Sequence, residues 1–149
     1  MWTSTCLAVA SIAIATGSSG CGDARSDDRS AVRAAFHDLS RDLEAGDLGH
    51  ACERLTANAV DHIGGLTNVP PRGCPQRVRA LLRATATSRD GTRGRLKVVS
   101  VILDGKRARI RARYRGGWTV WLPFVRDGGT WKADEIAGIS GPPPTIDLG

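Results

Sequence analysis

Apolar residues at helical spacing dominate the first half of the chain and predict three helices. Between residues 28 and 45 they lie on one face, and Gly46 supplies a stop. Asp47 can cap a second helix that ends by the glycine pair 64–65, and Pro75 suits the first turn of a third helix. The apolar stripe of the first helix consists of Val32, Ala35, Phe36, Leu39 and Leu43.

After Gly94 the period changes to the alternation of a β-strand. Strands are predicted at about 95–103, 107–115, 118–126 and 130–137, and glycine-containing turn signals separate them. Strands joined by such short turns form an antiparallel meander. The chain is therefore predicted to be an α+β protein, with three N-terminal helices packed on a four-stranded antiparallel sheet.

The alternation gives the sheet an apolar face and a basic face. We expect the first strand to turn Val99, Val101 and Leu103 toward the core. The alternating small and apolar residues of the second strand share that face and are Ala108, Ile110 and Ala112.

The other side of the second strand is an unbroken series of arginines, which are Arg107, Arg109, Arg111, Arg113 and Arg115. Burial of so many unpaired cations would be costly. We therefore expect Arg109, Arg111 and Arg113 to form a solvent-facing stripe. The nearest carboxylates on the predicted sheet are Asp134 and Glu135.

The N-terminus resembles an export signal. An apolar run at 7–15 is followed by small residues and Cys21, and it is far shorter than the roughly 20 residues of a membrane span. We expect Cys21 to accept lipid, although the segment before the run is uncharged and Ser18 stands where a leucine-like residue is usual. The alternative is plain secretion with Cys21 left free. Either reading places the protein outside the cytoplasm, anchored to the cell membrane or secreted.

This reading divides the chain into four parts. Residues 1–21 are the signal, 22–28 a tether, 29–140 one globular domain and 141–149 a flexible proline-rich tail.

Charge favours an acidic partner. The chain has 21 basic and 15 acidic residues, a formal net charge of +6, and none of them lies before Cys21. Arginine dominance partly reflects a GC-rich coding bias, and export argues against nucleic acid as the partner. Anionic lipid headgroups or envelope polymers are the more accessible counterpart.

The two cysteines of the expected domain, Cys52 and Cys74, are predicted to form a disulfide in an oxidising compartment. A metal site is the alternative, but the spacing fits no zinc pattern and His50 and His62 do not complete one. No metal or cofactor is expected.

Four stretches together resemble a known superfamily. They are 44–55 (EAGDLGHACERL), Cys74, 99–108 (VSVILDGKRA) and 122–132 (LPFVRDGGTWK). The chain is similar to exported members of the nuclear transport factor two-like, or ketosteroid isomerase-like, superfamily. This resemblance implies a cone, in which helices close over a curved sheet and leave a pocket. It does not imply an activity, because the superfamily includes enzymes and non-catalytic subunits.

An enzyme of this kind would need an acid–base set in the pocket. The candidates are Asp61 as base, His62 as its partner and Tyr114 as the oxyanion donor. Tyr114 is the sole tyrosine and can pack at a strand end, and an Asp-His pair near a helix end is commonly a solvated turn pair. The balance is against catalysis.

A non-catalytic binding role in the cell envelope is the principal hypothesis, with an apolar small molecule in the cone or another protein as partner. The candidate surface combines Arg109, Arg111 and Arg113 with Trp118 and Trp121. The alternative is that two of the aromatic rings on the last strands fill the core while arginine stems cover the others. Dimerisation is left open.

Overall fold

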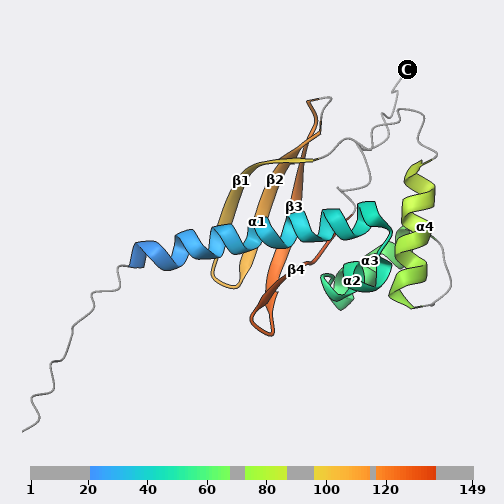
Figure 1. The fold of residues 1–149 in the computed structure, drawn as a ribbon, viewed down its shortest axis with the longest axis horizontal. Coiled ribbons are helices and arrows are strands. Elements are labelled where there is room, and N and C mark those ends of the chain that lie inside the picture. The colour runs from blue at the N-terminus through green and yellow to red at the C-terminus, as the bar shows by residue number, and fades with distance from the viewer. Residues whose placement is uncertain (1–20, 68–72, 87–95, 115–116, 137–149) are drawn as a thin grey trace, which may run out of the picture.

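The computed structural model describes residues 21–67, 73–86, 96–114 and 117–136, which form an α+β fold of four helices and one four-stranded antiparallel sheet (Figure 1). In chain order the elements are α1 (Cys21–Ala45), α2 (Leu48–Glu53), α3 (Ala57–Thr67), α4 (Cys74–Ala86), β1 (Lys97–Asp104), β2 (Arg107–Arg113), β3 (Thr119–Asp127) and β4 (Thr130–Ala133). The expected signal before Cys21 and the expected tail at 141–149 lie outside the described residues.

Helix α1 has the predicted apolar stripe. Val32, Phe36 and Leu39 are completely buried. At its end the Gly46 amide donates to the Leu43 carbonyl and the Asp47 amide to the Asp42 carbonyl, while Gly46 takes a φ of 74°. This is the Schellman arrangement, for which glycine is the favoured residue. The helix begins at Cys21, so residues 22–28, the expected tether, are helical and belong to α1.

The second predicted helix is in fact two, so the prediction of three helices was wrong. Helix α2 ends at Glu53 because the next residues pair with β4 instead: the Ala133 amide donates to the Arg54 carbonyl and the Thr56 amide to the Ala133 carbonyl. The Thr56 hydroxyl then accepts from the Ala59 amide and caps α3. Helix α3 continues through the glycine pair 64–65 to Thr67.

The sheet is the predicted meander, with strand order β1-β2-β3-β4. Its core face includes Val101, Ala108 and Ile110, as expected. Val99 does not join them and is 40% exposed. A β-bulge between Val98 and Ser100 shifts the register, so that Val98, rather than Val99, lies opposite Ala112 on the core face.

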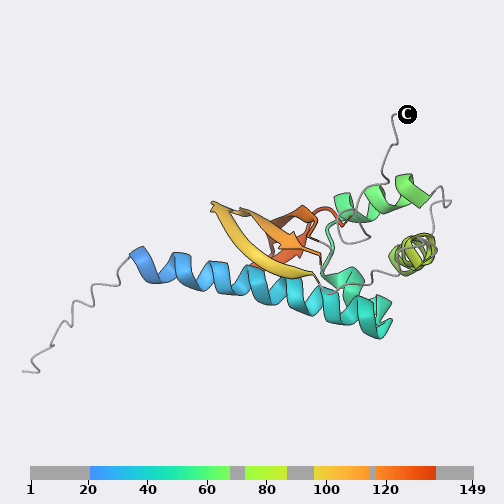
Figure 2. The ribbon, with the colours of Figure 1, turned by 90° about the horizontal axis from the view of Figure 1, so that it is seen from above.

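Helix α1 crosses the strands on one face of the sheet, and α2, α3 and α4 gather near its C-terminal end (Figures 1 and 2). The buried residues of these helices and of the core face of the sheet form one continuous cluster. The coarse arrangement of helices over a curved meander matches the prediction. No helix within the described part of the chain has both the length and the apolar character needed to cross a bilayer.

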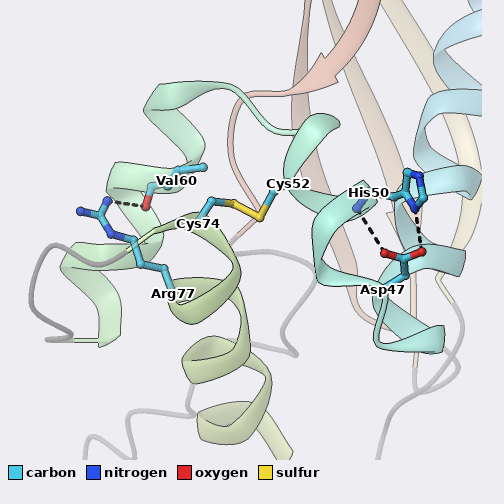
Figure 3. The surroundings of a disulfide bond; sticks show 6 residues. All are labelled: Asp47, His50, Cys52, Val60, Cys74 and Arg77. Carbon is cyan, nitrogen blue, oxygen red and sulfur yellow. Dashed lines mark hydrogen bonds and ion pairs between the residues drawn. A yellow bond between two sulfur atoms is a disulfide. The ribbon is translucent and has the colours of Figure 1, made fainter.

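A disulfide joins Cys52 of α2 to Cys74 at the start of α4, with 6.0 Å between the Cα atoms (Figure 3). The predicted pair is confirmed. It fastens α4 to the remainder of the helical layer across a loop of sequence separation 22.

Candidate binding surface

The arginines of β2 lie on the side of the sheet opposite α1. Along this strand the residues alternate strictly between exposed and buried, and the arginines are the exposed ones. We call the surface formed by Arg107, Arg109, Arg111 and Arg113 the arginine face. The solvent-facing stripe expected from the sequence therefore exists for these residues, and Arg115 lies outside the described part of the chain.

Each arginine stands between one residue of β1 and one of β3. Arg109 lies between Ile102 and Pro123, and Arg111 between Ser100 and Trp121. At the ends of the row, the pairs that flank Arg107 and Arg113 are Asp104 with Val125 and Lys97 with Thr119. The flanks are thus mostly apolar or neutral, and Asp104 is the one carboxylate among these flanking residues.

Among the described residues, none of the four arginines makes an ion pair. Arginines elsewhere do: Arg54 contacts Asp42 at 2.6 Å, and Arg126 contacts Asp28 at 3.1 Å. Asp134 and Glu135, the carboxylates expected nearby, have other partners. Asp134 accepts from the Thr56 hydroxyl at 2.7 Å, and Glu135 lies 3.5 Å from His62. The positive charge of the arginine face is therefore not neutralised by the described part of the fold.

The aromatic residues divide between core and surface. Phe124 and Trp131 are buried, whereas Trp118 and Trp121 are 51% and 48% exposed. The Arg109 guanidinium lies 5.7 Å from the centre of the Trp121 ring, a cation–π distance. Trp121 thus belongs to the arginine face. The sequence-based alternative put two rings in the core and arginine stems over the others. Phe124 and Trp131 fit the first part, and Arg109 over Trp121 fits the second part for that one ring.

Trp118 is exposed but does not share the face of Trp121. The Tyr114 amide donates to the Trp118 carbonyl, and Tyr114 follows the core-face parity of Ala112. Strand alternation therefore assigns Trp118 to the opposite side of the sheet from Trp121. Of the two tryptophans grouped from the sequence, the structure places only Trp121 on the arginine face.

A hollow of about 330 Å³ opens beside Arg107 and Arg109. Its walls include Ile102 of β1 together with Pro123 and Val125 of β3. The sequence analysis missed these apolar wall residues. Alternation was visible in both strands, and the register that runs from the turn after Asp104 sets Ile102 opposite Arg109, before the bulge between Val98 and Ser100.

The candidate catalytic residues have separate surroundings. Asp61 is exposed and pairs with Arg77 at 2.7 Å. His62 lies near Glu135, whereas Tyr114 is buried at the end of β2. Asp61 and His62 are thus each engaged with a charged partner outside the expected acid–base set. They also form no cluster with other ligating residues that could hold a metal ion, as far as the described chain extends.

Asp47 caps α2, as predicted, and it also pairs with the His50 side chain, which was not predicted. Asp47 accepts from the His50 amide at 3.3 Å, and its second carboxylate oxygen lies 2.7 Å from the His50 ring nitrogen Nδ1 (Figure 3). The side-chain hydrogen bond between them raises the pKa of His50 and lowers the pKa of Asp47. Both groups are solvent-exposed, so this is a helix cap and not an enclosed site.

Comparison with models of known protein families gives no match, and comparison with curated proteins gives none either. Function is therefore argued from the surface itself.

Proposed function

We propose that the protein is an exported, lipid-anchored binding protein of the cell envelope, and that its arginine face holds an anionic partner. One observation carries the proposal: four exposed arginines stand in a single row, and none makes an ion pair with a carboxylate of the described chain, although Asp104 lies across the strand pair from Arg107. The lipid anchor at Cys21 is the sequence prediction, and the binding role rests on the sheet.

The fold by itself gives no reason for this row. Neighbouring arginines on one face of a strand repel one another, and without acidic partners the repulsion lowers the stability of the isolated sheet. Neutral polar residues at these exposed positions would avoid that cost. A negatively charged partner removes the repulsion and releases the ordered counterions, so binding is the physical account that the arrangement favours.

The interior of the expected cone is a weaker location for a ligand. The residues on the core face of the sheet belong to one cluster of buried side chains that includes Phe36, Ile110 and Phe124. The hollow beside Arg107 is on the opposite face. We therefore place the binding function on the outside of the sheet, and the ion pair of Asp61 with Arg77 gives no support to a catalytic base at that position.

The test compares two variants with the same change in charge. The variant Arg109→Gln/Arg111→Gln removes two cations from the arginine face, and Arg29→Gln/Arg33→Gln removes two exposed cations from α1. On an immobilised sulfated polyanion, we expect the face variant to elute at clearly lower salt than the α1 variant, because clustered charges contribute more than dispersed ones. Equal elution of the two variants would contradict the proposal.

A further inference from the structure

We infer that the arginine face binds a linear phosphodiester polymer whose backbone carries no rings, lying along β2 with one phosphate at each arginine. This inference rests on the proposed function and names the partner class. Such a polymer is a chain of small polyols joined by phosphates.

The spacing of the charges matches a chain-like partner. Alternate residues of a strand are about 6.6–6.8 Å apart, so Arg107 and Arg113 span about 20 Å with two further arginines between them. A regular row of like charges is complementary to a polymer with a regularly repeated anion. The guanidinium fork also suits an oxyanion with two free oxygens, and a phosphodiester has two.

The shape of the face argues against a flat bilayer as the partner. The hollow beside Arg107 and Arg109 has apolar walls from β1 and β3, and Asp104 and Asp134 also belong to its lining. A thin, flexible chain can enter such a hollow and place its carbon units against Ile102 and Pro123. A bilayer surface would bridge the hollow and leave those walls in water.

The single tryptophan of the face argues against bases and sugar rings. Nucleobases stack on aromatic side chains that are open to them. The Trp121 ring already carries the Arg109 guanidinium over it at 5.7 Å. The remaining neighbours along the row, such as Ser100 and Pro123, offer no aromatic platform.

Two protein partners also fit poorly. A second copy placed face to face would oppose four arginines with four arginines, and like charges in register repel. An extended peptide added to the free edge of β1 would meet the bulge between Val98 and Ser100 and the charge of Lys97, which are features that oppose edge pairing. An acidic polypeptide lying on the face itself is left for the experiment to exclude.

The experiment measures binding of the full chain carrying Cys21→Ser, so that no lipid anchor contributes. The probes are a poly(glycerol phosphate) oligomer, poly-glutamate of equal charge, an oligothymidylate and vesicles containing anionic lipid. We expect the glycerol phosphate oligomer to bind at least about tenfold more tightly than each other probe, and log K to fall with log salt at a slope of about −3, as four phosphate contacts on a flexible chain require.

Variants then locate the site. Arg109→Gln/Arg111→Gln should reduce the magnitude of that slope by about half, since each lost phosphate contact on a flexible chain removes about 0.7 of a unit. Arg29→Gln/Arg33→Gln should leave the slope unchanged. A third variant, Ile102→Asp, places a negative charge at the hollow and should weaken glycerol phosphate binding at least about tenfold, while circular dichroism and thermal unfolding report that the variant is folded.

The outcomes separate the two proposals. Poly-glutamate could bind as tightly as the glycerol phosphate oligomer, or vesicles or oligothymidylate could bind more tightly. If that binding still depends on Arg109 and Arg111, the phosphodiester assignment is overturned and the anionic binding function stands. Loss of the arginine dependence for every probe would overturn both. Preferential binding of the glycerol phosphate oligomer with the expected variant pattern supports both.

Discussion

At the scale of single residues, Gly64 and Gly65 occupy adjacent positions of α3 with different surroundings. A Cβ at Gly64 would lie 3.0 Å from Cζ of Arg77, whereas one at Gly65 would meet nothing within 4 Å. The Arg77 guanidinium is not free to move away, because it donates to the Val60 carbonyl at 3.0 Å and to Asp61 at 2.7 Å. These contacts fasten α4 to α3, and Figure 3 shows the one to Val60.

We therefore expect opposite effects from the same substitution. Gly65→Ala should raise the free energy of unfolding by about 0.5–1 kcal/mol through helix propensity. Gly64→Ala should lower it by about 1 kcal/mol, because overpacking against Arg77 exceeds that gain. Urea unfolding of both variants gives the comparison, and a stabilised Gly64→Ala would show that Arg77 yields without cost.

The cap formed by Asp47 and His50 makes stability depend on pH. The pKa of His50 is raised above its ordinary value of 6.5 by the hydrogen bond to Asp47. The stability that protonated His50 contributes is thus fully present below about pH 6.5, and it is lost as the pH rises through the raised pKa. The pKa of Asp47 is lowered from 3.8, so its contribution is lost only as the pH falls through that lowered value.

Replacement of His50 should remove the part of the folding stability that the parent loses as the pH rises. We expect His50→Gln to be less stable than the parent near about pH 5.5 and closer to it near about pH 9, as measured by urea unfolding at each pH. His37→Gln, on the exposed side of α1, serves as the matched control and should not reproduce this convergence. If the free energies of unfolding of His50→Gln and the parent differ by the same amount at both pH values, His50 is not the source of the pH dependence.

At the scale of elements, the disulfide holds α4 to the rest of the helical layer. Helix α4 packs mainly on α3 and α2, and the bond joins Cys52 to the first residue of α4. Because the link closes a loop in the unfolded chain, its removal should cost about 2–4 kcal/mol.

Cys74→Ala should show this loss in thermal or urea unfolding. Cys52→Ala/Cys74→Ala should show the same loss, which checks that the unpaired Cys52 thiol of the single variant adds no effect of its own. Reducing agent should destabilise the parent and leave the double variant unchanged. If reducing agent does not change the stability of the parent, the disulfide does not stabilise the fold.

At the scale of the whole molecule, the expected anchor and the arginine face lie at different places. Helix α1 begins at Cys21 and its first turns extend past the sheet (Figure 1), while the arginine face is on the side of the sheet away from α1. An acyl group at Cys21 would hold that helix end at the membrane and leave the face open to the envelope space.

We expect the full chain expressed in a bacterium that acylates exported proteins to fractionate with membranes and to be released by detergent. Cys21→Ser should shift it to the soluble fraction. Mass spectrometry of the mature chain provides the direct measurement, and an unmodified Cys21 in the membrane fraction would contradict acylation.

The sequence determined those features that repeat locally. The stripe of Val32, Phe36 and Leu39, the stop at Gly46 and the alternation of arginines along β2 depend on periods of one helix or one strand, and each period states which side chains share a face. The exposure of the arginine face could be predicted because burial of unpaired cations is costly. The Cys52–Cys74 pair could be predicted because few cysteines are present to pair.

Only the tertiary structure decided features that arise between distant segments. Helix α2 ends where Arg54 and Thr56 find backbone partners on Ala133, although the local sequence is compatible with a continuous helix. The bulge at Val99, the hollow beside Arg107 and the ion pair of Asp61 with Arg77 likewise follow from strand pairing and packing. A single segment cannot specify them, since the hydrogen bonds and contacts that stabilise them belong to two segments far apart in the chain.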